Sequence, residues 1–213
     1  MNTQMLVSHL ANSLRSVKRV AYRRVNCEWI AVTLSSLAVI GLLYGFRPDL
    51  AFQLAQPLFA AEIALNILLI AIAGFSAASF AYPDRAGTPL LGPLLAAVFA
   101  GYSAVALLTA FRAPAMLDGV VNTVPHGLQC LLCILAFAAV PAAWMLWRLR
   151  GLASTRPMLT GMAALLLAAA TGSLGVRLVE IETAPDGLIV WHYLPLLVLS
   201  GAGLVAGRKI FRW

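Results

Sequence analysis

Six runs of about 20 predominantly apolar residues divide this chain, and they constrain its fold more than any other feature. A helix of that length is long enough to cross the hydrocarbon core of a bilayer. The sequence therefore predicts an all-α integral membrane protein, a six-transmembrane-helix bundle that leaves no room among 213 residues for a separate soluble domain. The predicted spans cover approximately residues 27–46, 58–80, 90–111, 126–147, 157–177 and 188–206.

The composition supports a membrane protein and argues against nucleic-acid binding. Hydrophobic residues make up 62% of the chain and charged residues 11%, whereas soluble domains carry roughly 25% charged residues. The net charge of +7 could indicate a nucleic-acid partner, but such binding needs a basic face on a soluble element. Here the basic residues lie in loops and tails, so we expect the lipid bilayer as a partner and no direct nucleic acid.

The segment before the first span, residues 1–26, has the pattern of a basic amphipathic helix. We treat it as a unit distinct from the transmembrane domain, residues 27–213. Two interpretations remain open: a surface helix on anionic lipid, or a docking helix for a cytoplasmic partner. The predicted contacts of the docking helix are its apolar stripe and the basic residues beside it: Leu6, Leu10, Leu14, Val17, Arg15, Lys18 and Arg19.

The distribution of Lys and Arg predicts the orientation of the bundle. Short loops rich in these residues stay in the cytoplasm. Twelve of the 15 Lys and Arg residues lie in the two tails and in the loops after the second and fourth spans. The other loops contain only Arg47, Arg112 and Arg177. Both termini are therefore predicted to be cytoplasmic, with these three arginines on the outer side.

Soft metal ligands gather at the outer start of the fourth predicted span. His126, Cys130 and Cys133 stand at i, i+4 and i+7 and so share one face of a helix. The same outer level holds further candidate ligands: Glu62, Glu180, Glu182 and His192. Thiolates, imidazoles and carboxylates at one depth could hold a metal ion. A disulfide, a redox-sensing thiol pair, or simple packing of small apolar side chains are the alternatives.

Two other polar positions have simpler interpretations. Glu62 and Asn66 stand at i and i+4 inside the second span, a costly placement unless both side chains face protein or water. We therefore expect them to point into the bundle. Cys27 lies at the predicted cytoplasmic edge, away from the other two cysteines, and three cysteines are too few for a disulfide framework.

Several motifs, in this order, carry a resemblance to a known family. After the basic N-terminal segment come Gly45-Phe46-Arg47-Pro48-Asp49-Leu50, Cys130, Pro141, Ser154-Thr155-Arg156-Pro157, Trp191 and Gly207-Arg208-Lys209-Ile210-Phe211-Arg212-Trp213. In this the chain resembles the six-span "negative regulator of sigma F" family of membrane anti-sigma factors over nearly its whole length.

The resemblance implies a function. The N-terminal segment is expected to hold an extracytoplasmic-function sigma factor inactive at the inner membrane of a bacterium, while an outer cysteine senses metal or oxidative stress. No obligatory cofactor is expected, and a soft divalent metal of the zinc or cadmium type would act as the signal. The chain departs from the family at one point. The second outer cysteine expected before the sixth span is missing, and Glu180 stands in its place.

Two other classes of protein compete with this interpretation. A quinone-linked thiol-disulfide oxidoreductase could use Cys130 and Cys133, but it would need a second cysteine pair that the chain lacks. A small transporter could use Glu62 and Asn66, yet no charged residue lies near the midplane of a predicted span. We find no nucleophile paired with a base, phosphate loop or zinc hydrolase motif, so the sequence does not predict an enzyme.

Overall fold

A computed structural model describes residues 3–5, 7–8, 20–85, 89–111, 124–152, 154–180 and 188–211. Every regular element in these ranges is helical. Six helices are long and apolar enough to cross a membrane, as the sequence predicts. The elements from residue 20 onward are α2 (Tyr22–Tyr44), α3 (Leu50–Leu54), α4 (Pro57–Ala81), η1 (Pro83–Arg85), α5 (Leu91–Phe111), α7 (Val124–Arg150), α8 (Pro157–Val179), η3 (Leu188–Tyr193) and α9 (Leu194–Ile210).

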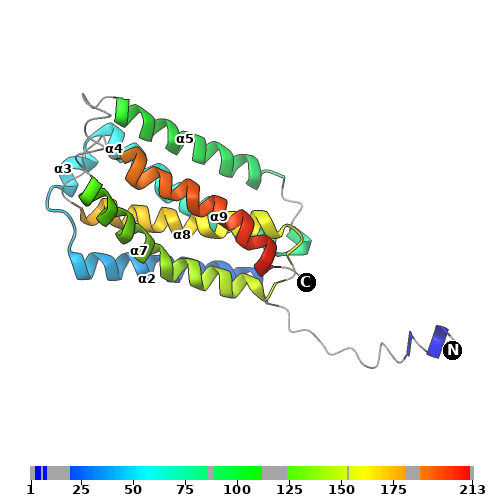
Figure 1. The fold of residues 1–213 in the computed structure, drawn as a ribbon. Helices are drawn as coiled ribbons and strands as arrows, with labels where there is room; N and C mark the ends of the chain where they lie inside the picture. The colour runs from blue at the N-terminus through cyan, green and yellow to red at the C-terminus, as the bar shows by residue number, and fades with distance from the viewer. Residues whose placement is uncertain are drawn as a thin grey trace.

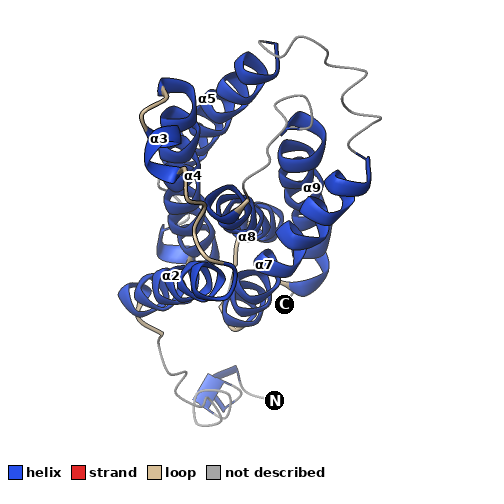
Figure 2. Cartoon of the chain, turned by 90° about the vertical axis from the view of Figure 1, so that its left-hand side faces the viewer, coloured by secondary structure: helices blue, strands red, loops and turns tan. Residues whose placement is uncertain are grey.

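The six long helices lie side by side and alternate in direction along one axis (Figure 1). The start of α2 and the end of α9 therefore lie at the same end of the bundle. Viewed along the bundle, α8 occupies the centre and α5 lies at the periphery beside α4 (Figure 2). Of an 18-residue window in α8, 78% is buried inside the protein, against 22% in α2, α5 and α9. Helix α8 is thus the core helix.

Glycines allow α8 to pack closely against α9. A Cβ atom added to Gly203 would lie 2.4 Å from the carbonyl oxygen of Gly161, and one added to Gly207 would lie 2.2 Å from that of Pro157. Both distances are too short for a real Cβ atom, so only glycine fits at these two positions. The backbones of α8 and α9 are therefore in direct contact there. Small residues at helix contacts are typical of packing in membranes, where no hydrophobic force draws helices together.

The predicted spans agree with the helices in number and order, and differ at several ends. Helix α2 begins at Tyr22 rather than Cys27, because Tyr22 and Asn26 are held in the bundle by hydrogen bonds and packing. Helix α7 runs through Pro141 and on to Arg150. The last span begins with a short π-helical turn, η3, and α9 continues to Ile210. Polar residues at these ends extend the helices beyond their apolar cores.

The predicted inward direction of two polar side chains is confirmed. Glu62 and Asn66 on α4 are 2% and 1% exposed. The predicted N-terminal docking helix lies mostly outside the described residues. Of its predicted contacts, Leu6, Leu10, Leu14, Val17, Arg15, Lys18 and Arg19 are all outside them.

Candidate sensing site

Three of the predicted ligands converge at the end of the bundle opposite the termini. The thiol of Cys130 donates a hydrogen bond to Oε1 of Glu180 over 2.9 Å. Nε2 of His192 lies 3.6 Å from Oε2 of the same carboxylate. One potential ligand atom from each residue lies within 4.8 Å of the other two. Cys130 and His192 are buried, and the side chain of Glu180 is 13% exposed.

Each of the three side chains comes from a different element. Cys130 lies in the first turns of α7, and Glu180 is the residue at which α8 ends and the backbone becomes extended. His192 lies in η3. Its neighbour Trp191, also in η3, packs against Gly127 of α7. A Cβ atom on Gly127 would lie 2.1 Å from the indole ring, so glycine at this position lets η3 approach α7. That approach brings His192 to Cys130.

The donor set of this cluster suits a borderline or soft divalent cation. Cysteine sulfur, histidine nitrogen and carboxylate oxygen are the ligands of protein zinc sites, and three of them leave a fourth position open. Around one tetrahedral ion such ligand atoms would stand about 3.5 Å apart. The present separations of up to 4.8 Å need only a small contraction to reach that geometry. The residues therefore fit a metal ion, which would replace the proton on the thiol.

The remaining predicted ligands do not join this cluster among the described residues. Cys133 lies one turn further along α7 and is partly exposed. Glu62 is buried in a separate ion pair. The side chain of His126 and the whole of Glu182 lie outside the described part of the chain. Cys27 is exposed near the other end of the bundle, as expected from its position in the sequence.

Sequence reasoning missed the partner of Glu62. Nη2 of Arg177 on α8 donates to its carboxylate over 2.7 Å, and the two side chains are 6% and 3% exposed. The guanidinium of Arg177 lies 4.9 Å from the centre of the Phe59 ring, where a cation–π attraction adds to the pair. A carboxylate inside an apolar span needs a cation beside it, so the presence of Glu62 in the second span could have predicted an arginine partner. The three arginines of the predicted outer loops were the candidates to supply that cation.

Arg47, another of these three arginines, stabilises the turn beside the cluster. Its guanidinium donates two hydrogen bonds to Asp49, over 2.7 and 2.8 Å, and holds the pKa of that carboxyl well below its usual range. Its backbone N–H donates to the carbonyl of Leu178 over 3.1 Å. The turn after α2 is thereby attached to the last turn of α8, two residues before Glu180.

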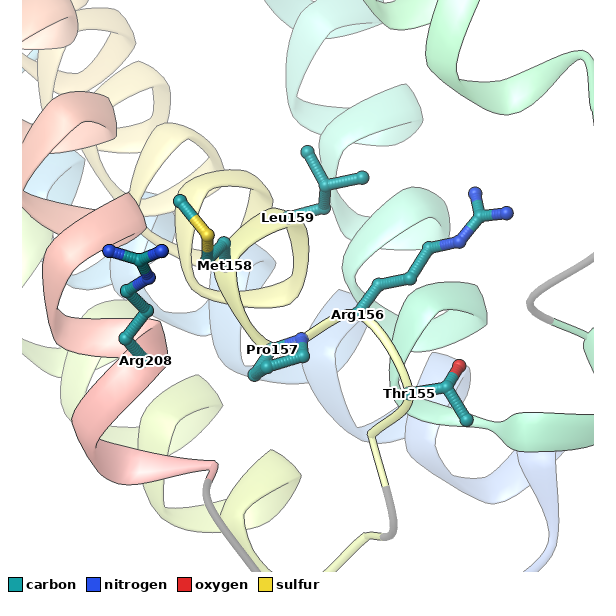
Figure 3. A pocket seen from close by; sticks show the side chains of 6 residues that line it. All are labelled: Thr155, Arg156, Pro157, Met158, Leu159 and Arg208. Atoms are coloured by element: carbon teal, nitrogen blue, oxygen red, sulfur yellow. The ribbon is translucent and has the colours of Figure 1, made fainter.

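A pocket at the opposite end of the bundle lacks this convergence. It has a volume of about 560 Å³ and is lined by Thr155, Arg156, Pro157, Met158, Leu159 and Arg208. Figure 3 shows the side chains of Arg156 and Arg208 pointing away from each other. No pair of polar groups in this view is aimed at one point, so the Cys130 cluster is the better candidate site.

Comparison with known proteins places the chain in a family. A family model described as "Negative regulator of sigma F" matches residues 10–213. The chain belongs to this family. The anti-sigma-F factor NrsF of Caulobacter vibrioides (strain NA1000 / CB15N) is 32% identical over 182 residues, covering 83% of this chain and 82% of the relative. A probable anti-sigma-F factor NrsF of Azospira oryzae (strain ATCC BAA-33 / DSM 13638 / PS) is 27% identical over 179 residues, covering 84% and 83%. No solved structure matches the chain.

Membership in the negative regulator of sigma F family confirms the resemblance seen in the sequence. The resemblance implies a second outer cysteine where this chain has Glu180, and Glu180 is the residue that the Cys130 thiol contacts. In this chain the side chain beside Cys130 is thus the Glu180 carboxylate and not a thiol, so Cys130 cannot form a disulfide at this contact.

Proposed function

We propose that this chain is a membrane anti-sigma factor whose N-terminal segment sequesters an extracytoplasmic-function sigma factor. The family match over residues 10–213 supports the anti-sigma factor role, and both relatives are named as anti-sigma-F factors. The relatives are regulators, in line with the expectation that this chain is not an enzyme. The six long apolar helices support a location in the bacterial inner membrane. The excess of Lys and Arg near the termini supports cytoplasmic tails.

We further propose that Cys130, Glu180 and His192 form the sensing site on the outer side. A divalent cation entering there would displace the thiol proton, forming a sulfur–metal bond and releasing H⁺ to solvent. Glu180 and His192 would supply the next two ligands. Because a ligand shifts an equilibrium only by its differential affinity for two states, the released state must hold these three groups closer together. A coupling of about 1–3 kcal/mol would change sigma affinity by roughly 5–150-fold.

The test uses the purified complex of the full chain with its sigma factor. Cadmium is added, and release of the sigma factor is measured by size-exclusion chromatography. The parent protein should release its partner, and Cys130→Ser should capture the partner normally but keep it in the presence of cadmium. Cys133→Ser should have a weaker effect than Cys130→Ser.

Cys27→Ser serves as the matched control, because this thiol is exposed and lies near the start of α2, at the end of the bundle opposite the cluster. It should respond to cadmium like the parent. If Cys130→Ser also responds like the parent, the sensing site lies elsewhere and the Cys130 cluster is only packing.

A further inference from the structure

The point where the N-terminal segment enters the bundle is held by side chains from two other helices. The hydroxyl of Tyr82, just after α4, donates to the carbonyl of Val20 over 2.9 Å. The hydroxyls of Tyr22 and Ser79 are 2.9 Å apart, and the rings of Tyr22 and Tyr82 meet edge to face. The first residues of α2 are thus attached to the end of α4.

A second attachment joins α2 to α7 through a bridging carboxylate. Oε1 of Glu28 accepts a hydrogen bond from Nε of Arg24, one turn earlier on α2, over 2.7 Å. Its Oε2 accepts one from Nε of Arg148 on α7, also over 2.7 Å. The side chain of Arg148 is 17% exposed and that of Arg24 is 73% exposed. The contact between helices is therefore the better shielded of the two.

Helix α7 connects this ion pair to the candidate sensing site. Cys130 lies near its start and Arg148 in its last turn, so one helix spans the distance of roughly 27 Å between them. Helix α2 begins at Tyr22, directly after the extended residue Ala21, and the segment expected to hold the sigma factor precedes it in the chain. The pair Glu28–Arg148 is thus a direct link between the helix that bears Cys130 and the base of the N-terminal segment.

We infer that Glu28 and Arg148 are positioning residues that fix where the N-terminal segment leaves the bundle. A movement of α7 reaches that segment through their ion pair. Neither residue needs to contact the sigma factor for this role. The expected effect on sigma capture rests on the proposed function. The ion pair that attaches α2 to α7 can be tested on this chain without a sigma factor.

The test measures the hydrogen exchange of backbone amides in the full-length protein, in detergent and without any partner. Glu28→Gln and Arg148→Gln should each raise the exchange of the hydrogen-bonded backbone amides of residues 24–26, on the order of tenfold, because a partly shielded ion pair is lost. Arg24→Gln is the matched control: it removes only the exposed pair within α2, and we expect less than a twofold change.

A charge swap separates the ion pair from other effects of the substitutions. In the Arg24→Gln background, Glu28→Arg combined with Arg148→Glu rebuilds the pair with reversed polarity and should restore slow exchange to within about threefold of Arg24→Gln alone. Exchange in α8 reports whether the bundle is intact. If a single substitution unfolds the bundle, rescue by the swap still supports the pair, and failure of the swap to rescue overturns it.

Sigma affinity is measured on the same variants. The single substitutions should weaken capture about tenfold, and the swap should restore it. Parent-like exchange in both glutamine variants would overturn the inference while leaving the proposed function standing. A parent chain that captures no sigma factor would overturn the proposed function, and the exchange data would then decide the attachment by themselves.

Discussion

At the scale of single residues, the buried pair of Glu62 and Arg177 is a costly placement. Both charges lie in helices that are apolar enough to cross a membrane, and each neutralises the other over 2.7 Å. Removing one partner of a buried pair leaves an unpaired charge and typically costs about 3–5 kcal/mol. The pair connects α4 to the core helix α8, so the effect should extend to the whole bundle.

We predict that Glu62→Gln lowers the stability of the purified protein by about 3–5 kcal/mol, measured by thermal unfolding in detergent. Arg177→Met introduced together with Glu62→Gln should recover part of the loss, because no charge then remains buried. Arg24→Gln is the control, since the Arg24 side chain is 73% exposed in its pair with Glu28 and its loss should matter little. Equal losses for Arg24→Gln and Glu62→Gln would contradict this account.

The sequence predicted the directions of single side chains better than their partners. The helical spacing of Glu62 and Asn66 and the cost of exposing a polar group to lipid were enough to predict that both side chains point into the bundle. The choice of Arg177 over Arg47 depends on how α4 and α8 are rotated against each other. That rotation follows from packing across the whole bundle, which no local pattern in the sequence records.

At the scale of elements, the contact of α8 with α9 depends on backbone approach. Gly203→Leu should destabilise the bundle, because even the Cβ atom would overlap the Gly161 carbonyl. Gly201→Leu is a matched control two residues away, where an added Cβ meets nothing within 4 Å. Thermal unfolding should separate the two variants by at least about 2 kcal/mol. Indistinguishable stabilities would mean that α9 is not held by this contact.

The N-terminal segment gives a second prediction at this scale. If it docks a sigma factor through its apolar stripe, Leu10→Glu combined with Leu14→Glu should abolish capture by the purified protein while the helical content stays unchanged. Asn12→Glu combined with Ser16→Glu adds the same charge to the opposite face of the predicted helix and should preserve capture. A double Leu variant that still captures the sigma factor would favour the lipid-surface interpretation of this segment.

Elements were predicted well where apolar length alone decides them. Six helices and their order follow from hydropathy and from proline or glycine at the turns. The π-helical turn η3 could not be predicted in this way, since the residues Trp191 and His192 continue the apolar run without a break. Their position depends on Gly127 across the helix interface. The convergence of His192 with Cys130 is therefore a tertiary property.

For the whole molecule, the orientation of the bundle has its own test. A reporter that is active only in the cytoplasm should work when it is fused after Arg150 or after Trp213, and it should be inactive after Asp118. The reason is the concentration of Lys and Arg in the tails and in two of the loops. Activity after Asp118 would invert the orientation and place the Cys130 cluster on the cytoplasmic side.

The central claim for the whole molecule is capture of a sigma factor by the intact membrane protein. The most direct measurement is affinity purification of the full-length chain from membranes of its own cells, followed by mass spectrometry of the proteins that come with it. We predict that a sigma factor of the extracytoplasmic-function class co-purifies in stoichiometric amount and is absent when a tagged, unrelated six-span protein is purified in the same way. An inserted, folded chain that brings no sigma factor with it would contradict the account.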